Sequence, residues 1–265
     1  MLPDLARAAW QFRGFILSSV KREFQSRYQN SLLGGVWTVI NPLAMILVYT
    51  LVFSQLMRAR LPGSDNSLAY GIYLCAGVLT WGFFSELIGR GQSMFLEHAR
   101  LLKKLSFPRI CLPIVVLLNA SINFSIIFAL FIGFLLITQN MPGLVILAVI
   151  PVLLLQALLA LSLGTILGVL NVFFRDVAHL TGVILQFWFW FTPIVYPLDI
   201  LPENIQAIAL LNPMTQIVGA YQGIFVHEQW PHWQNLIPTL LATLVLCILA
   251  IGLFRKRAGE MVDEL

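Results

Sequence analysis

The sequence of 265 residues contains few charged side chains: 11% are Asp, Glu, Lys or Arg, whereas soluble domains carry about 25%. Hydrophobic residues make up 59%, and the mean hydropathy is +0.86. A soluble fold with this composition would expose a large apolar surface. The scarcity of charge therefore excludes a soluble domain and predicts an all-α membrane protein, since a helix satisfies its own backbone groups in lipid.

The sequence also lacks the motifs of common catalytic and metal sites. No Lys follows a Gly, so the phosphate loop GK[ST] is missing and we expect no ATPase activity in this chain. The four His residues are scattered, without HExxH. Cys75, Cys111 and Cys247 lie in apolar segments without metal-ligand spacing, and we expect small core residues there. These absences predict no catalytic residue, no metal and no cofactor.

Six apolar segments have the length and composition of membrane spans. All but two of the 16 Lys and Arg residues fall on one side of these segments; only Arg58 and Arg60 fall on the other. The positive-inside rule then predicts that both termini are cytoplasmic. Topology explains the basic excess better than nucleic acid binding does. The predicted spans are 36–57, 68–88, 110–138, 144–172, 179–195 and 236–254.

The N-terminal segment 5–29 holds no continuous apolar run, so we expect no cleaved signal peptide. Apolar residues recur there at three- and four-residue steps with basic residues between them, which is typical of an amphipathic helix on a membrane surface. A tail that only directs topology is the alternative. The apolar positions are Leu5, Ala9, Phe12, Ile16, Val20 and Phe24.

A polar and basic segment, 92–107, separates the second and third predicted spans. Its periodicity predicts a helix with an apolar face that is formed by Phe95, His98, Leu101, Leu102 and Leu105. Such a helix suits a groove on a soluble partner, and a loop held at anionic lipid is the equal alternative. Its candidate contact residues are Glu97, His98, Arg100, Leu101, Lys103 and Lys104.

The segment from Gln186 to Pro213 starts as an apolar helix and breaks at Thr192-Pro193. The helical pieces near 202–211 and 213–226 are too short to cross a membrane, which predicts a hairpin dipping back from the outer face at 197–226. Four prolines punctuate it: Pro193, Pro197, Pro202 and Pro213.

Aromatic residues crowd the same segment. Consecutive helical residues point about 100° apart, so an aromatic run cannot all face lipid at one boundary. Some of these side chains should face other helices or a transport pathway, where flat rings suit the C–H faces of sugars; an interfacial belt is the alternative. The aromatic residues are Trp188, Phe189, Trp190, Phe191 and Tyr196.

Three smaller features concern the spans themselves. Gly164 and Gly168 form a small-xxx-small pattern that lets helices approach closely. Asn119 and Asn123 match glycosylation sequons inside a span, so we interpret them as hydrogen-bonding groups between helices. Glu86 is the acidic residue nearest to membrane depth; it has either a function there or only an edge position facing water.

Several motifs in order resemble the ABC-2 type permeases that export polysaccharides, over essentially the whole chain. Within that family the chain is most similar to the membrane subunits of O-antigen exporters, with capsule and teichoic-acid permeases as near relatives. The motifs are Arg27-Tyr28, Ser31-Leu32-Leu33-Gly34, Trp37 and Asn41-Pro42 around the first span, then Phe174-Arg175-Asp176, Thr192-Pro193-Ile194-Val195-Tyr196-Pro197 and Asn212-Pro213.

The resemblance implies a homodimer in the bacterial inner membrane, bound to two copies of a separate ABC ATPase that holds ATP and Mg. It makes 5–29 an interface helix, 92–107 the coupling helix and 197–226 the periplasmic gate. The cargo would be a polysaccharide on polyprenyl diphosphate. By resemblance and charge, the diphosphate would enter near Arg22, Arg27, Tyr28, Leu33 and Gly34.

Two other functions stay open. A drug or small-lipid exporter of the same superfamily would share most of these motifs. A membrane-embedded glycolipid transferase is the alternative from another class, although no cluster of Asp, Glu and His on the cytoplasmic edge supports it.

Overall fold

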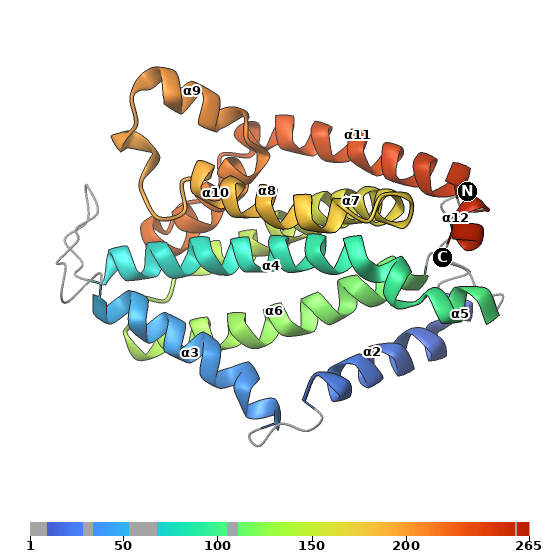
Figure 1. Cartoon of the computed structure of the whole chain (residues 1–265). Helices are drawn as coiled ribbons and strands as arrows, with labels where there is room; N and C mark the ends of the chain where they lie inside the picture. Colours follow the sequence, from blue (N-terminus) through green and yellow to red (C-terminus); the bar gives the residue numbers. More distant parts are fainter. Residues whose placement is uncertain (1–9, 29–33, 53–67, 105–110, 258, 265) are drawn as a thin grey trace.

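The computed structural model describes residues 10–28, 34–52, 68–104, 111–257 and 259–264, which form helices joined by short connections (Figure 1). The helices are α2 (Arg13–Tyr28), η1 (Gly34–Val36), α3 (Trp37–Tyr49), α4 (Ala69–Glu97), α5 (Ala99–Lys104), α6 (Cys111–Ile137), η3 (Leu144–Ala148), α7 (Val149–Phe173), α8 (Val177–Phe191), η4 (Leu198–Ile200), α9 (Glu203–Leu211), α10 (Pro213–His227), α11 (Trp233–Arg257) and α12 (Glu260–Glu264).

Four of these segments are long and apolar enough to cross a membrane: α4, α6, Leu144–Phe173 and α11. They confirm the apolar helices expected at 68–88, 110–138, 144–172 and 236–254. Two shorter apolar helices, Trp37–Val52 and Val177–Phe191, lie where the other two spans were expected. The end of the predicted span 36–57 lies outside the described residues.

Helix α4 is the centre of the bundle. In its most apolar stretch 72% of the residues are buried inside the protein, against 22% in α6 and in α11. It packs against α7, α10 and α6 (Figure 1). Because α4 is buried on most sides, its neighbours take their positions from it.

Three glycines let α4 and α7 approach at backbone distance. A Cβ atom built on Gly91 would lie 2.8 Å from the Cα of Gly164, and one built on Gly168 would lie 2.5 Å from the carbonyl oxygen of Gly91. Real Cβ contacts are not that short, so neither position accepts a larger side chain without movement. The structure thus confirms the close helix approach expected from Gly164 and Gly168.

The structure corrects the boundaries expected for the helix 92–107. Helix α4 does not end near residue 88 but continues to Glu97, and the chain leaves helical geometry at His98 before α5 begins. Phe95, expected on a partner-binding face, is fully buried and stacks on Phe254, with ring centroids 5.7 Å apart. Burial of Phe95 is the physical reason that α4 extends this far. Residues 105–107 lie outside the described part.

Helix α2 presents the expected apolar face, but to a different partner. Ile16 and Val20 are buried against Cys111 and Val115 at the start of α6. The face predicted to lie in the acyl boundary therefore packs on protein. Leu17, elsewhere on the helix, is exposed, and so is Trp10 just before it. Residues 5–9 of the predicted helix are outside the described residues.

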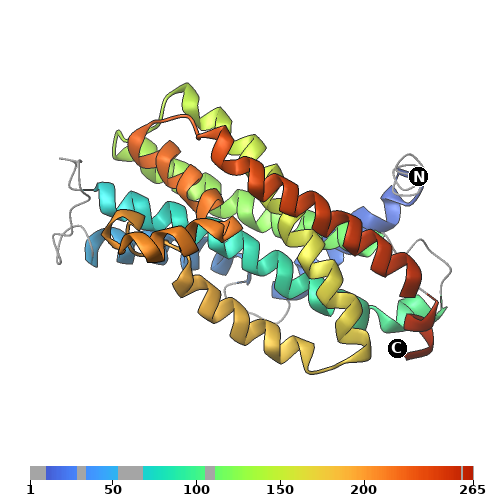
Figure 2. The same cartoon turned by 90° about the horizontal axis from the view of Figure 1, so that it is seen from above.

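The two ends of the bundle carry different elements. Figures 1 and 2 place α5 and α12 at one end and α9, with the connection from α8 to α10, toward the other. Helix α4 connects the two ends through 29 residues, a length of roughly 44 Å.

The glycine contacts between α4 and α7 make a prediction about stability. Gly168→Ala should destabilise the protein by about 1–3 kcal/mol, because the added methyl group collides with backbone that cannot move aside. Thermal unfolding in detergent measures the effect. Gly133→Ala in α6 is the control, since nothing lies within 4 Å of its built Cβ; equal losses in both variants would contradict the close approach.

Candidate functional site

The chain leaves helical geometry at the end of α8 because Pro193 follows Thr192. A residue before proline is disfavoured in the α conformation, and Thr192 is extended, with φ −98° and ψ 131°. The Thr192 hydroxyl donates to the carbonyl oxygen of Trp188 at 2.8 Å. The bend that follows, Thr192–Pro197, contains no regular hydrogen-bonded structure.

Side chains from two other helices satisfy the backbone of this bend. From α4, the Tyr70 hydroxyl donates to Val195 O at 2.7 Å and the Tyr73 hydroxyl to Tyr196 O at 3.0 Å. From α10, the Gln222 amide donates to Ile194 O at 3.4 Å. Irregular backbone at membrane depth is tolerated where protein surrounds it, and these donors meet that condition.

Asn212 connects the end of α8 to the start of α10. Its Oδ1 accepts from the Trp188 indole N–H at 2.9 Å and from the Met214 backbone N–H at 3.0 Å, and its Nδ2 donates to Thr192 Oγ1 at 2.9 Å. Asn212 is also the N-cap of α10, with Pro213 at the first helical position. This role of Asn212 was not predicted from the sequence, although an Asn-Pro pair at the start of a helix was the available signal.

The aromatic run of α8 divides into two groups. Trp188 and Phe189 turn toward α4, where both rings meet the Trp81 ring edge-on, at centroid distances of 6.2 and 5.7 Å. Trp190 and Phe191 turn away and are 59% and 71% exposed. The expectation that these side chains cannot share one environment is confirmed, and the structure assigns each to its group.

An aromatic pocket of about 260 Å³ lies between the end of α8 and α9. The Tyr196 hydroxyl donates to Trp190 O at 2.7 Å, which fixes the ring. The lining residues are Trp188, Phe191, Tyr196, Leu201, Ile205, Ile208, Ala209 and Asn212.

A second, more polar hollow of about 300 Å³ lies beside the bend and α10. Asp199, Thr215 and His227 line it, together with Tyr73 and Gln222. The four expected gate prolines each occupy a boundary in this region. Pro193 and Pro197 belong to the bend and line the hollow, Pro202 is the residue before α9, and Pro213 begins α10.

The residues expected to contact an ATPase lie at the opposite end of α4. Glu97 is the exposed last residue of α4 and accepts from the Ser93 hydroxyl at 2.7 Å. His98 contacts Met94 O through Nδ1 at 2.9 Å. In α5, Arg100 and Lys103 are exposed, whereas Leu102 is buried. Leu101 and Lys104 also belong to α5, but their side chains lie outside the described part.

The residues expected at the diphosphate entrance are only partly visible. Arg22 is exposed on α2. Arg27 and Tyr28 form the end of α2, but their side chains, like Leu33, are outside the described part; Gly34 begins η1. The structure therefore does not test whether these five residues gather.

Polar side chains of α2, α4 and α6 form a cluster nearby. Asn123 Nδ2 donates to Glu86 Oε2 at 2.6 Å, and Arg90 Nε donates to Glu86 Oε1 at 2.8 Å. Asn119 donates to Glu23. These bonds confirm the interhelical role expected for the two asparagines and show Glu86 in an ion pair. The partner Arg90 was not predicted, although its i, i+4 spacing from Glu86 could have indicated it.

The sequence profile of the ABC-2 type transporters matches residues 15–226, which include the bend, α5 and most of the described helices. The chain belongs to the ABC-2 type transporter family.

Three characterised proteins are similar to this ABC-2 chain over most of its length. The O-antigen export system permease protein RfbA of Myxococcus xanthus is 33% identical over 98% of this chain and 99% of its own. A protein of the same name from Klebsiella pneumoniae is 25% identical over 89% and 88%. The polysialic acid transport protein KpsM of Escherichia coli is 20% identical over 92% and 93%.

The hydrogen bonds of Asn212 predict that replacing this residue lowers the free energy of unfolding. Asn212→Ala removes both connections to α8 and leaves the Trp188 N–H without its acceptor, which should cost about 1–3 kcal/mol. Thermal unfolding in detergent compares it with Asn204→Ala, an exposed position in α9. Equal unfolding midpoints for the two variants would show that Asn212 does not hold the bend.

Proposed function

We propose that this chain is the membrane subunit of an ABC transporter that exports a polysaccharide across the bacterial inner membrane. The observation that carries the proposal is the likeness, over nearly the full length of both chains, to an O-antigen export permease. The likeness to a polysialic acid transport protein supports polysaccharide as the general class of cargo. More specifically, we propose that the polymer is of the O-antigen type and is linked to polyprenyl diphosphate. A capsular or teichoic-acid polymer is the alternative.

The proposed topology has six crossings, with both termini cytoplasmic. Four long apolar helices and two shorter ones at the expected positions support it. The bend and helices α9 and α10 then form a re-entrant gate on the periplasmic side, while α5 and the basic end of α11 face the cytoplasm. The basic residues Arg255, Lys256 and Arg257 at that end agree with the positive-inside rule.

In the proposed assembly two copies of the chain bind two copies of a cytoplasmic ABC ATPase, which supplies ATP and Mg. Helix α5 is the coupling element. Its exposed Arg100 and Lys103 offer charge to the ATPase, while buried Leu102 fixes the helix to the bundle. Because α5 follows α4 with one residue between them, a displacement of α5 is transmitted to the other end of α4, where Tyr70 and Tyr73 hold the gate.

The proposed glycan path follows the outward aromatic residues of α8 and the aromatic pocket. Phe191 and Tyr196 line the pocket, and aromatic rings suit the C–H faces of sugars. Helix α4 contributes small residues on its least buried face, at Gly82, Ser85 and Gly89, which would not obstruct a sugar chain. At the other membrane face, Arg22 and Arg27 would attract the diphosphate.

Loss of export in cells tests the proposed function. Deleting the gene should remove the cell-surface polymer and cause lipid-linked polymer to accumulate inside the inner membrane, and expression of this chain should restore export. Surface polymer at the normal level in the deletion strain would overturn the proposal. Accumulation of unpolymerised precursor would instead favour the transferase alternative.

The coupling role of α5 predicts a specific defect. Reversing two exposed charges with Arg100→Glu and Lys103→Glu should abolish the stimulation of ATP hydrolysis by cargo, because contact with the ATPase is lost. ATPase assays on the purified complex measure this. Lys256→Glu, at an exposed position at the end of α11, is the matched control; stimulation by cargo in the double variant would exclude these side chains from coupling.

The aromatic pocket predicts a transport defect without a folding defect. Phe191→Ala should slow export by roughly two- to tenfold, which corresponds to the free energy of one aromatic contact. The unfolding midpoint should not change. Phe187→Ala is the control: it is 60% exposed on the same helix but does not line the pocket. Pulse-labelled export assays compare the two, and equal rates would place the path elsewhere.

A further inference from the structure

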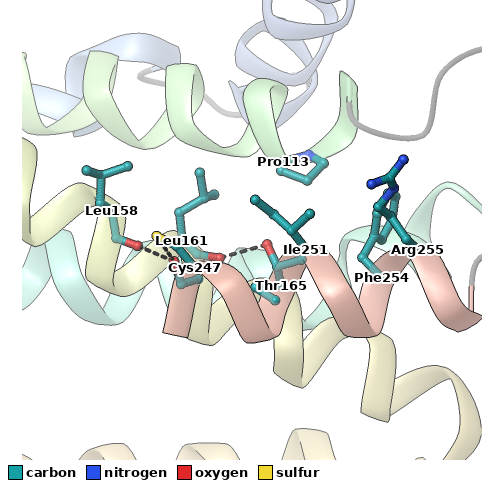
Figure 3. A pocket seen from close by; sticks show the side chains of 10 residues that line it. Pro113, Leu158, Leu161, Thr165, Cys247, Ile251, Phe254 and Arg255 are labelled. Carbon is teal, nitrogen blue, oxygen red and sulfur yellow. Dashed lines mark hydrogen bonds between the residues drawn. The ribbon is translucent and has the colours of Figure 1, made fainter. Parts of the chain in front are cut away.

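An apolar groove of about 220 Å³ lies at the surface of the bundle, away from the bend (Figure 3). Helix α7 contributes its floor through Leu158, Leu161, Ser162 and Thr165. Pro113 of α6 contributes one side, and α11 contributes the other. The α11 residues are Cys247, Ala250, Ile251, Phe254 and Arg255.

The hydroxyl groups that line the groove are already hydrogen-bonded. Thr165 donates to Leu161 O and Ser162 donates to Leu158 O, each at 2.7 Å. The Ser162 hydroxyl also lies 2.9 Å from the Cys247 sulfur atom. Figure 3 shows these bonds running along and between the helices, so these hydroxyls are already occupied within the protein. The body of the groove therefore suits a hydrocarbon chain.

One end of the groove is cationic. Arg255 lines it, and Figure 3 shows the guanidinium group beyond Ile251 and Phe254. Among the basic residues at this end of α11, Arg255 is the one whose side chain lines the groove. An anionic head group would match it in charge.

We propose that this groove binds one acyl chain of an anionic phospholipid, with the phosphate at Arg255. Helix α11 is long and apolar enough to span the membrane, so a groove on it opens to lipid. An empty groove would forfeit dispersion contacts along its lining, and an acyl chain restores them. From Cys247 to Arg255 the groove follows α11 for roughly 12 Å, parallel to the direction in which lipid chains lie.

The lipid site is independent of the cargo and of the ATPase, and binding tests it directly. The purified full-length chain is exchanged into detergent with phosphatidylglycerol or phosphatidylcholine, and native mass spectrometry counts the lipids retained per chain. Ile251→Trp fills the groove and should remove the retained lipid of either kind. Arg255→Gln should keep the acyl chain but reduce the preference for phosphatidylglycerol, on the order of fivefold for one basic residue.

Matched controls lie on the same helix. Ile248→Trp adds the same bulk at a position that is 71% exposed and outside the groove, and Lys256→Gln removes a neighbouring exposed charge; both should bind lipid as the unchanged chain does. If Ile251→Trp does not fold, Ile251→Phe replaces it, with partial loss expected. Equal lipid retention in the Ile251 and Ile248 variants would overturn the proposal. Dissociation of subunits by Ile251→Trp alone would also overturn it, because a second copy of the chain would then occupy the groove.

Discussion

In the proposed re-entrant position, the backbone carbonyls of the bend Thr192–Pro197 need hydrogen-bond donors from within the protein, because hydrocarbon supplies none. Tyr70 and Tyr73 of α4 and Gln222 of α10 are those donors. This requirement fixes the end of α4 beside the bend and brings α10 back against α4. The aromatic pocket exists because α9 is the connection that the chain forms between these two fixed points.

Helix α4 joins the bend to the opposite end of the molecule. Its close contact with α7 through Gly91, Gly164 and Gly168 leaves little room for it to shift sideways. A helix confined in this way transmits movement along its axis better than across it. The Tyr70 and Tyr73 hydroxyls at one end and α5 at the other end are therefore mechanically connected. If the bend acts as the proposed gate, its opening requires breakage of these hydrogen bonds, not unfolding of α8.

Most helix positions could be predicted from the sequence, because long apolar runs form helices and prolines mark where helices begin or break. The starts of α9 and α10 follow from Pro202 and Pro213. Predictions that depended on tertiary contacts were incomplete: α4 extends to Glu97 because Phe95 is buried against α11, and the apolar face of α2 packs on α6. Hydropathy cannot distinguish a side chain facing lipid from one facing another helix, since both environments are apolar. Helix geometry predicts that the aromatic run faces two environments. It does not predict which residue faces which, because the interior position of Trp188 depends on its contact with Trp81, more than a hundred residues earlier.

In the proposed function, this ABC-2 chain conducts a lipid-linked glycan and a separate ATPase supplies the energy. The most direct measurement reconstitutes the chain with its ATPase in vesicles that carry polyprenyl-diphosphate-linked polysaccharide on the ATPase side. Glycosidase outside the vesicles then reports how much polymer is still accessible. ATP should make the polymer inaccessible to the glycosidase only when both proteins are present. ATP-independent loss of accessibility, or transport of small drugs but not of the polymer, would contradict it.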